Sequence, residues 1–257
     1  MQPAEIAEAF HVAFLNVLAA SADPRTFAVK GGANLRFYLG SLRYSEDIDL
    51  DAFVDDPRLF SQKLERAIRS RDLARLLDAV GIKMGEPNNK DRAQANSIKE
   101  KWNFALSHRD VGVPVPTRVE MSYRSNDLRD YIKIERMPAG VAAQYSPIPA
   151  PTVGHYVERG CLIHKIRALE NRRETQPRDV FDLDYLFRRY PDAPRRGLVD
   201  PGLIGWAIGR LFEIGYPEYR SKVLPFLDSS IYTAYASEDA WINMHLYVSG
   251  HLEDMGR

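Results

Sequence analysis

Two short segments in the first fifth of the chain carry the residues whose types and spacing could do chemistry. The first is Lys30-Gly31-Gly32, and the second, after ten further residues, runs from Arg43 to Asp49. Along a β-strand, residues i and i+2 point to the same face, about 6.6 Å apart. Asp47 and Asp49 therefore present two carboxylates side by side, while Ile48 enters the core.

This pair of carboxylates predicts a metal site. Close carboxylates repel unless a cation joins them, and hard oxygen ligands suit Mg²⁺, which prefers a few carboxylates together with substrate phosphates. The Gly31-Gly32 turn lets backbone N–H groups approach a phosphate closely. Nucleotidyl transfer requires a loop that binds a triphosphate and a strand that holds two metal ions. The alternative is a solvated strand face, because two acids at this spacing are common by themselves.

A third carboxylate is expected, since two metals need more than two acidic ligands. Glu120 is the candidate, because Val119 and Met121 alternate inward and leave Glu120 on the opposite face of its strand. If that strand neighbours the aspartate strand with aligned faces, Glu120 completes the metal site. The open alternative is a solvated glutamate on an edge strand.

Two charged residues later in the chain fall inside apolar helical stripes. They are Lys165 and Asp179, and a buried charge is costly unless it is paired or hydrogen-bonded. One interpretation is a buried salt bridge between them, or a lysine that reaches solvent. The other is a site in which Lys165 meets a triphosphate, while Asp179 orients the lysine or acts at the reacting hydroxyl.

The elements that must position these residues divide the chain into two halves. Strand patterns cover 26–29, 47–53, 101–106 and 117–123, and helical spacing covers 4–20, 33–39 and 57–80, with a polar loop at 86–96. Three prolines between residues 146 and 151 indicate an extended linker. Helical spacing then covers 155–172, 177–190, 200–214, 217–227 and 233–250. The sequence predicts an α+β fold, with an α/β domain over 1–150 and a helical domain over 151–257.

Composition excludes several classes of protein. The 35 Lys+Arg balance 35 Asp+Glu, so the chain is not a globally basic nucleic-acid coat, and its single cysteine excludes a disulfide framework. No window approaches the roughly 20 apolar residues of a bilayer span. Glu5 and Glu8 precede the N-terminal apolar stretch, where a signal peptide carries cations. We expect a cytoplasmic protein with no membrane partner.

Arginines gather in the two predicted helices that carry Lys165 and Asp179. A solvated surface is the default interpretation of this region, because acids are interleaved with the basic residues. An arginine excess beside a phosphoryl-transfer site could instead bind a nucleic-acid backbone. The arginines are Arg167, Arg172, Arg173, Arg178, Arg188 and Arg189, and the acids are Glu170, Glu174, Asp182 and Asp184.

The chain resembles the AbiEii/AbiGii toxin family, nucleotidyltransferases of bacterial abortive-infection and toxin–antitoxin systems that include the MenT-like toxins. The matching motifs are Lys30 to Leu35, Arg43 to Leu50, His164 to Arg172 and Arg178 to Leu183, within about residues 27–190. One departure is Ala33, where the family often has Thr or Ser, so a hydroxyl that could touch a phosphate is missing.

This resemblance implies a fold and a set of roles. The fold is a polymerase-β-like nucleotidyltransferase core, a mixed sheet flanked by helices, followed by a helical C-terminal half. Asp47 and Asp49 are implied as metal ligands, Lys165 as the triphosphate contact and Asp179 as a catalytic acid or base. The implied nucleotide contacts are Gly31, Gly32, Arg43 and Ser45.

We therefore expect an Mg²⁺-dependent nucleotidyltransferase toxin that uses an NTP. The expected acceptor is an RNA, the 3′ end of tRNA in several relatives, and a cognate antitoxin is a further expected partner. One alternative keeps the fold and changes the acceptor to a small molecule or a protein hydroxyl, which the zero net charge favours. Another is a non-catalytic nucleotide-binding module, although lost catalysis usually leaves gaps among such site residues.

Overall fold

The computed structural model of the chain describes residues 1–88, 99–123, 127–171 and 174–257. Most of the loop predicted at 86–96, together with Arg172 and Arg173, lies outside these residues. The described residues form two compact units. The first comprises Met1–Gly40 and Tyr44–Tyr156, and the second comprises Ser41–Arg43 and Val157–Arg257.

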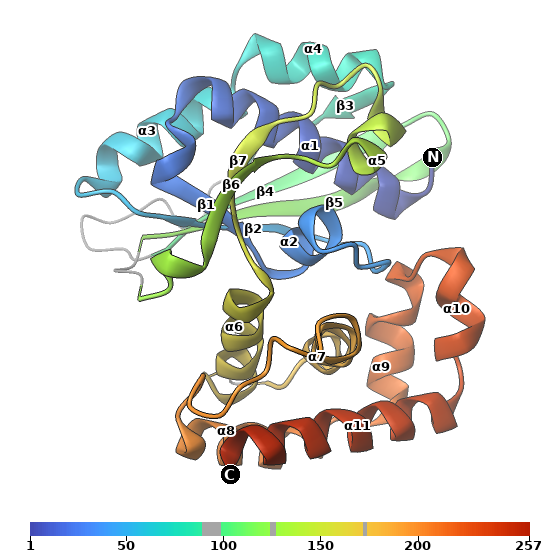
Figure 1. Cartoon of the computed structure of the whole chain (residues 1–257). Helices are drawn as coiled ribbons and strands as arrows, with labels where there is room; N and C mark the ends of the chain where they lie inside the picture. Colours follow the sequence, from blue (N-terminus) through green and yellow to red (C-terminus); the bar gives the residue numbers. More distant parts are fainter. Residues whose placement is uncertain (89–98, 124–126, 172–173) are drawn as a thin grey trace. The chain divides into compact units, whose positions relative to one another are not determined.

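A mixed seven-stranded sheet organises the first unit (Figure 1). Its strand order is β3-β4-β5-β2-β1-β7-β6. The pairs β2–β5 and β1–β7 are parallel, and the other neighbouring pairs are antiparallel. The strands are β1 (Phe27–Lys30), β2 (Ile48–Ala52), β3 (Ile82–Met84), β4 (Lys99–His108), β5 (Val111–Ser122), β6 (Ile132–Arg136) and β7 (Thr152–Tyr156).

The helices of the first unit are α1 (Pro3–Ser21), α2 (Gly31–Tyr38), α3 (Pro57–Ile68), α4 (Arg71–Ala79) and the short α5 (Ala139–Ala142). The prediction of a single helix over 57–80 is therefore wrong, because the helix is interrupted between α3 and α4. Ser70 caps the start of α4, where its Oγ accepts a hydrogen bond from the Leu73 N–H at 3.0 Å. A serine at this position satisfies a backbone donor that a continuous helix would have used internally.

The first helix, α1, is the central core helix of this unit. Phe10, Phe14 and Leu15 are fully buried and belong to the core cluster. By length and composition α1 could also cross a membrane, which corrects the expectation that no segment is apolar enough. Because 67% of its apolar window is buried inside the structure, α1 meets that test as a core helix does.

Period-2 alternation separates an apolar face of the sheet from a charged face. Val29, Leu50 and Met121 are register neighbours in the core cluster that contains α1. The next row, on the opposite face, joins Lys30, Asp49, Glu120 and Lys101 across β1, β2, β5 and β4. The strand of Glu120 thus neighbours the aspartate strand with aligned faces, and it is an interior strand and not an edge strand.

The second unit is helical. Its helices are α6 (Glu158–Asn171), α7 (Pro177–Arg189), α8 (Pro201–Leu211), α9 (Tyr216–Lys222), α10 (Ser229–Tyr235) and α11 (Glu238–Gly256). Helix α11 packs against α7 and α8, and α6 packs against the same two helices. The helix predicted over 233–250 is instead α10 followed by α11, because Ser237 caps the start of α11. The segment Ser41–Arg43 also belongs to this unit. The Asp228 N–H donates a hydrogen bond to the Leu42 carbonyl at 2.8 Å.

Strand β7 corrects both a predicted helix start and the predicted domain boundary. Residues 152–156 pair with β1 and β6, although helical spacing was expected from residue 155. The first unit therefore extends through Tyr156 and does not end at residue 150. Gly154 explains the fit, because a Cβ there would lie 2.4 Å from the Phe27 carbonyl oxygen.

A buried histidine connects α1 to the chain just before Asp47. His11 Nε2 lies 2.8 Å from Thr117 Oγ1, and Thr117 Oγ1 donates to the Glu46 carbonyl at 2.7 Å. Since the one hydroxyl proton of Thr117 goes to Glu46, His11 Nε2 must be the donor. Nδ1 is buried and has no hydrogen-bond partner among the described residues, which favours the neutral ring. Burial lowers the pKa of His11 to about 3.

Acidification should therefore destabilise the protein through His11. Between the unfolded-state pKa of about 6.5 and the folded-state pKa of about 3, only the unfolded chain binds the proton. Stability is complete above that window and falls by about 1.4 kcal/mol per pH unit as the pH is lowered through it. His11→Gln keeps a donor for Thr117 and removes the titration. Urea melts from pH 4 to 7 give the free energy of unfolding as a function of pH. Its slope should be smaller in the variant by the contribution of one proton. Equal slopes in the two proteins would contradict a neutral buried His11.

Candidate active site

The chain turns from β1 into α2 at two glycines. Gly31 has a φ of +68°, in the left-handed region that favours glycine, and a Cβ there would lie 2.9 Å from Asp49 Oδ2. Glycine is thus required at this position both by the backbone and by the neighbouring carboxylate. The first N–H groups of α2 have no intrahelical partner, and they form the positive end of the helix dipole. This turn can bind an anion beside Asp49.

Helix α2 is held in place by polar contacts along its length. The Asn34 side-chain amide donates to the Tyr156 carbonyl at 2.8 Å, and the Tyr156 N–H donates to Asn34 Oδ1 at 3.2 Å. Two residues later, the buried Arg36 guanidinium donates to Glu8 of α1 at 2.9 Å. The glycine turn is therefore fixed before any ligand arrives, which lowers the entropic cost of binding one.

Eight charged side chains share the polar face of the sheet. The carboxylates are Asp47, Asp49, Asp51 and Glu120, and the cations are Lys30, Lys99, Lys101 and Arg118. Most of them form pairs within the face. Arg118 donates to Asp47 Oδ2 at 2.8 Å. Lys30 donates to Asp51 at 2.5 Å, and Asp51 also accepts from the Tyr156 hydroxyl at 2.8 Å.

Asp49 differs from its neighbours, because no hydrogen bond or ion pair to its carboxylate occurs among the described residues. Lys30 lies directly opposite it in the register but donates to Asp51 and, at 3.0 Å, to Ser122. A partly buried carboxylate between other carboxylates, without a cation of its own, favours a bound cation. Asp49 and the neighbouring Asp47 offer the hard oxygen atoms that Mg²⁺ prefers.

Glu120 lies opposite Asp49 in the register, and two lysines engage its carboxylate. Lys99 donates to it at 2.5 Å, and Lys101 lies at 3.5 Å. Burial raises the pKa of Glu120, yet the hydrogen bond from Lys99 and the charges of both lysines outweigh burial and hold this pKa below its usual value. Within the described ranges no three metal-ligating side chains gather in one cluster.

Ser45 and Arg43, both predicted as nucleotide contacts, have protein partners. Ser45 Oγ donates to the Asp47 carbonyl at 2.8 Å, so it fixes the backbone that presents Asp47. The Arg43 guanidinium donates to both oxygens of Asp182, each at 2.9 Å. A nucleotide contact through these Arg43 donors would require Asp182 to release them.

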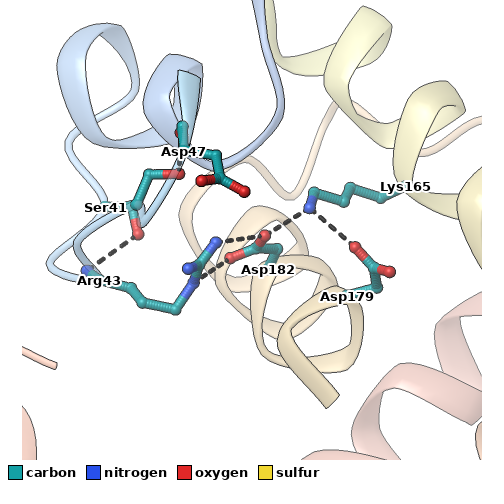
Figure 2. A network of polar contacts seen from close by, with 7 residues as sticks. Ser41, Arg43, Asp47, Lys165, Asp179 and Asp182 are labelled. Carbon is teal, nitrogen blue, oxygen red and sulfur yellow. Dashed lines mark hydrogen bonds and ion pairs between the residues drawn. The ribbon is translucent and has the colours of Figure 1, made fainter. Parts of the chain in front are cut away.

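The second unit contains a buried network of two cations and two carboxylates (Figure 2). Lys165 Nζ lies 2.6 Å from Asp182 and 2.9 Å from Asp179. Asp182, fully buried, thus joins Lys165 to Arg43. The Lys165–Asp179 salt bridge, one of the two interpretations of these charges, is observed.

Two aspartates on α7 have pKa values that shift in opposite directions. Burial raises the pKa of Asp182, but the charges of Arg43 and Lys165 outweigh burial and lower this pKa to about 2. Burial also raises the pKa of Asp184, and its partner Arg188 offsets the effect only in part. Because both aspartates are buried, the expectation that they lie on a solvated surface is wrong.

Several residues of these clusters were missed in the sequence, although local signals point to some of them. Asp51 continues the i, i+2 series of Asp47 and Asp49, and Asp182 lies three residues, about one helical turn, after Asp179. The lysines of β4 also alternate at i, i+2. No local signal, however, shows that β4 pairs with the strand of Glu120.

Comparison with known proteins supports a nucleotidyltransferase fold. A family model described as "Nucleotidyl transferase AbiEii toxin, Type IV TA system" matches residues 13–200. The fold is similar to that of JHP933 from Helicobacter pylori, with a TM-score of 0.61 and 16% identity over 100% of this chain and 93% of that one. It is also similar to the nucleotidyltransferase toxin MenT4 from Mycobacterium tuberculosis, with a TM-score of 0.56 and 17% identity over 98% and 84%. No curated protein sequence matches the chain.

The opposite pKa shifts on α7 predict opposite effects of two similar substitutions. Asp182→Asn should lower the free energy of unfolding by about 3–5 kcal/mol, because Arg43 and Lys165 lose their shared buried anion. Asp184→Asn should be neutral or stabilising, since the folded protein disfavours the charged form of that side chain. Urea melts of both variants at pH 7 test this contrast. Equal losses of stability would show that the network contributes nothing specific.

Proposed function

Because the chain belongs to the AbiEii family of nucleotidyl transferase toxins, we propose that it transfers a nucleoside monophosphate from an NTP to the 3′-hydroxyl of an RNA. The chain is a nucleotidyltransferase of a toxin–antitoxin family, with a mixed sheet flanked by helices. The proposal adds the acceptor, the metal and the residues. The 3′ end of a tRNA is the proposed acceptor, and Mg²⁺ is the proposed metal.

The metal proposal rests on the surroundings of the Asp49 carboxylate. Among the described residues it lacks the protein cation that Asp47, Asp51 and Glu120 each have. It also lies against the glycine turn, at the position where a Cβ of residue 31 would collide with it. The residues fit a magnesium ion held by Asp49 and Asp47, with the remaining ligands from substrate phosphates and water. Glu120 is left out of this proposal because the two lysines hold it.

The protein groups of the first unit have distinct proposed roles in the reaction. The N–H groups of Gly31 and Gly32 bind the phosphates, and Asp47 and Asp49 hold the metal next to them. The bound metal would activate the hydroxyl and stabilise charge on the leaving group. The hydroxyl oxygen forms a bond to the α-phosphorus, the bond from that phosphorus to the bridging oxygen breaks, pyrophosphate leaves with the electron pair, and the hydroxyl proton passes to water.

The helical unit contributes a separate proposal, which rests on the family resemblance and on the geometry within that unit. Lys165 is proposed to bind the triphosphate, and Asp179 is proposed to orient Lys165 as its hydrogen-bond partner. An ammonium group has three N–H donors, and the two aspartates accept from two of them. A phosphate oxygen can therefore take the third donor without breaking the network.

The proposed partners follow from the same family. An NTP and a cognate antitoxin are the partners that a toxin of a type IV toxin–antitoxin system implies. An RNA acceptor is the more specific proposal, supported by the basic residues beside the aspartates, and it would place the reaction in the cytoplasm.

Incubation of the protein with each labelled NTP and total bacterial RNA tests the proposed reaction. Label at RNA 3′ ends, with release of pyrophosphate, is the expected result. Label in a small-molecule or protein fraction would replace the RNA acceptor with the alternative one. Binding of an NTP without any pyrophosphate release would instead indicate a non-catalytic module.

Asp49→Asn should abolish transfer and leave the thermal midpoint unchanged or higher, because it removes a repulsive charge without breaking a protein ion pair. Asp51→Asn is the matched control on the same strand. It leaves Lys30 without its ion-pair partner, so its midpoint should fall clearly. Thermal melts and pyrophosphate release from both variants provide the comparison. An Asp49→Asn protein that melts early yet transfers normally would make Asp49 a structural residue.

Lys165→Ala and Asp182→Asn both break the buried network, but only the first removes the ammonium group. If Lys165 binds the triphosphate, Lys165→Ala should raise the Kd for NTP by more than tenfold, and Asp182→Asn should raise it far less. Asp179→Asn, which leaves the ammonium group without one of its orienting partners, should raise this Kd less than Lys165→Ala does. NTP titrations well below the melting temperature measure this difference. Equal losses of affinity in the first two variants would reduce Lys165 to a structural role.

A further inference from the structure

Two lysines on β4 lie over the carboxylate of Glu120 on the polar face of the sheet. Lys101 is the register partner of Glu120, and Lys99 is the partner of Ser122, two residues further along β5. Their ammonium groups lie 3.5 and 2.5 Å from the Glu120 oxygens. The lysine side chains are 34% and 42% exposed, whereas that of Glu120 is 14% exposed. The carboxylate therefore lies beneath two cations that reach solvent.

The charges of this cluster do not cancel. Counted by themselves, two lysines and one glutamate carry a net charge of +1, whereas Arg118, on the same face of β5, is paired with Asp47. Holding two ammonium groups on one carboxylate keeps them close together despite their mutual repulsion. Glu120 thus places two phosphate-binding groups at a defined position.

The position of the lysine cluster in the sheet indicates the side of Asp49 from which an acceptor approaches. In the order β4-β5-β2-β1, the strand of Asp49 has the glycine turn on its β1 side and the lysines on its β5–β4 side. The proposed NTP phosphates lie at the glycines. In an in-line displacement, the attacking and leaving oxygens are on opposite sides of the phosphorus. The lysine side of Asp49 is therefore the side from which an acceptor approaches.

We infer that Lys99 and Lys101, held by Glu120, form a subsite for a backbone phosphate of the acceptor RNA. This inference rests on the proposed function and names the surface that the acceptor occupies. Glu120 is a positioning residue in it, and not a metal ligand. Lysine contacts to phosphates fix the register of a nucleic acid without reading its bases, so the subsite binds RNA of any sequence.

Salt-dependent binding of labelled bulk tRNA, in EDTA and without NTP, tests the subsite. Each phosphate contact to a single strand contributes about 0.7 to the slope of log K against log salt concentration. The double variant Lys99→Gln/Lys101→Gln removes the contact to that one phosphate, so it should lower the slope by about 0.7, and its Kd for NTP should stay unchanged. Lys133→Gln is the matched control, because Lys133 is an exposed strand lysine whose register partner, His155, pairs with Val29 on the apolar face.

The possible outcomes separate the inference from the function on which it rests. If wild-type protein binds tRNA and the double variant shows the same slope, the subsite is wrong and the proposed function stands. If the double variant loses affinity for NTP and not for tRNA, the lysines serve the nucleotide and the inference is overturned. If wild-type protein transfers nucleotides but binds no RNA, the RNA acceptor and the subsite both fail.

Glu120→Gln adds an independent readout. Removing the carboxylate raises the net charge of the cluster from +1 to +2, so tRNA affinity should rise severalfold at low salt and Mn²⁺ affinity should not change. A carboxylate that partly neutralises the lysines and binds no metal predicts this pair of results, which a general loss of stability would not produce. Loss of Mn²⁺ binding in Glu120→Gln would make Glu120 a metal ligand and overturn its assignment as a partner of the lysines.

Discussion

The parallel pairing of β2 with β5 is the constraint on which the candidate site depends. It places Asp49 beside Glu120 and, on the other face, Leu50 beside Met121. Both apolar side chains are fully buried, and burial of each contributes about 1.5–3 kcal/mol. A slip of one residue would move these side chains to the charged face and the carboxylates into the core. The hydrophobic core therefore sets the positions of the charges.

Given this register, the distribution of cations decides what each carboxylate can do. Asp51, Asp47 and Glu120 are partnered by lysine or arginine, and they stabilise the face as ion pairs. Asp49 remains without such a partner among the described residues, in a position where repulsion from its neighbours is uncompensated. Such a residue is unfavourable for the isolated fold and useful for binding a metal, which is the trade-off common at functional sites. The glycine turn, the proposed phosphate site, lies directly beside it.

Local periodicity accounts for what could be predicted from the sequence. The i, i+2 spacing of Asp47 and Asp49, and the outward position of Glu120, depend only on strand geometry, and the structure confirms both placements. The partners of these residues depend on which strands pair, and Lys99 and Lys101 come from a strand whose neighbours the sequence does not specify. The same limit applies to Asp182, whose partner Arg43 lies 139 residues away. Strand β7 was missed because its close approach to β1, through Gly154, is a tertiary contact.

The proposed role of Asp49 is to hold a divalent cation, in a position where no protein cation pairs with its carboxylate among the described residues. Electron paramagnetic resonance of Mn²⁺, titrated with the full chain, measures this binding directly. Wild-type protein should remove the signal of free Mn²⁺. The variant Asp55→Asn, which changes an exposed acid just after the same strand, should do so equally. Asp49→Asn should leave the free signal unchanged. A folded Asp49→Asn protein that binds Mn²⁺ as tightly as the wild type would contradict the account.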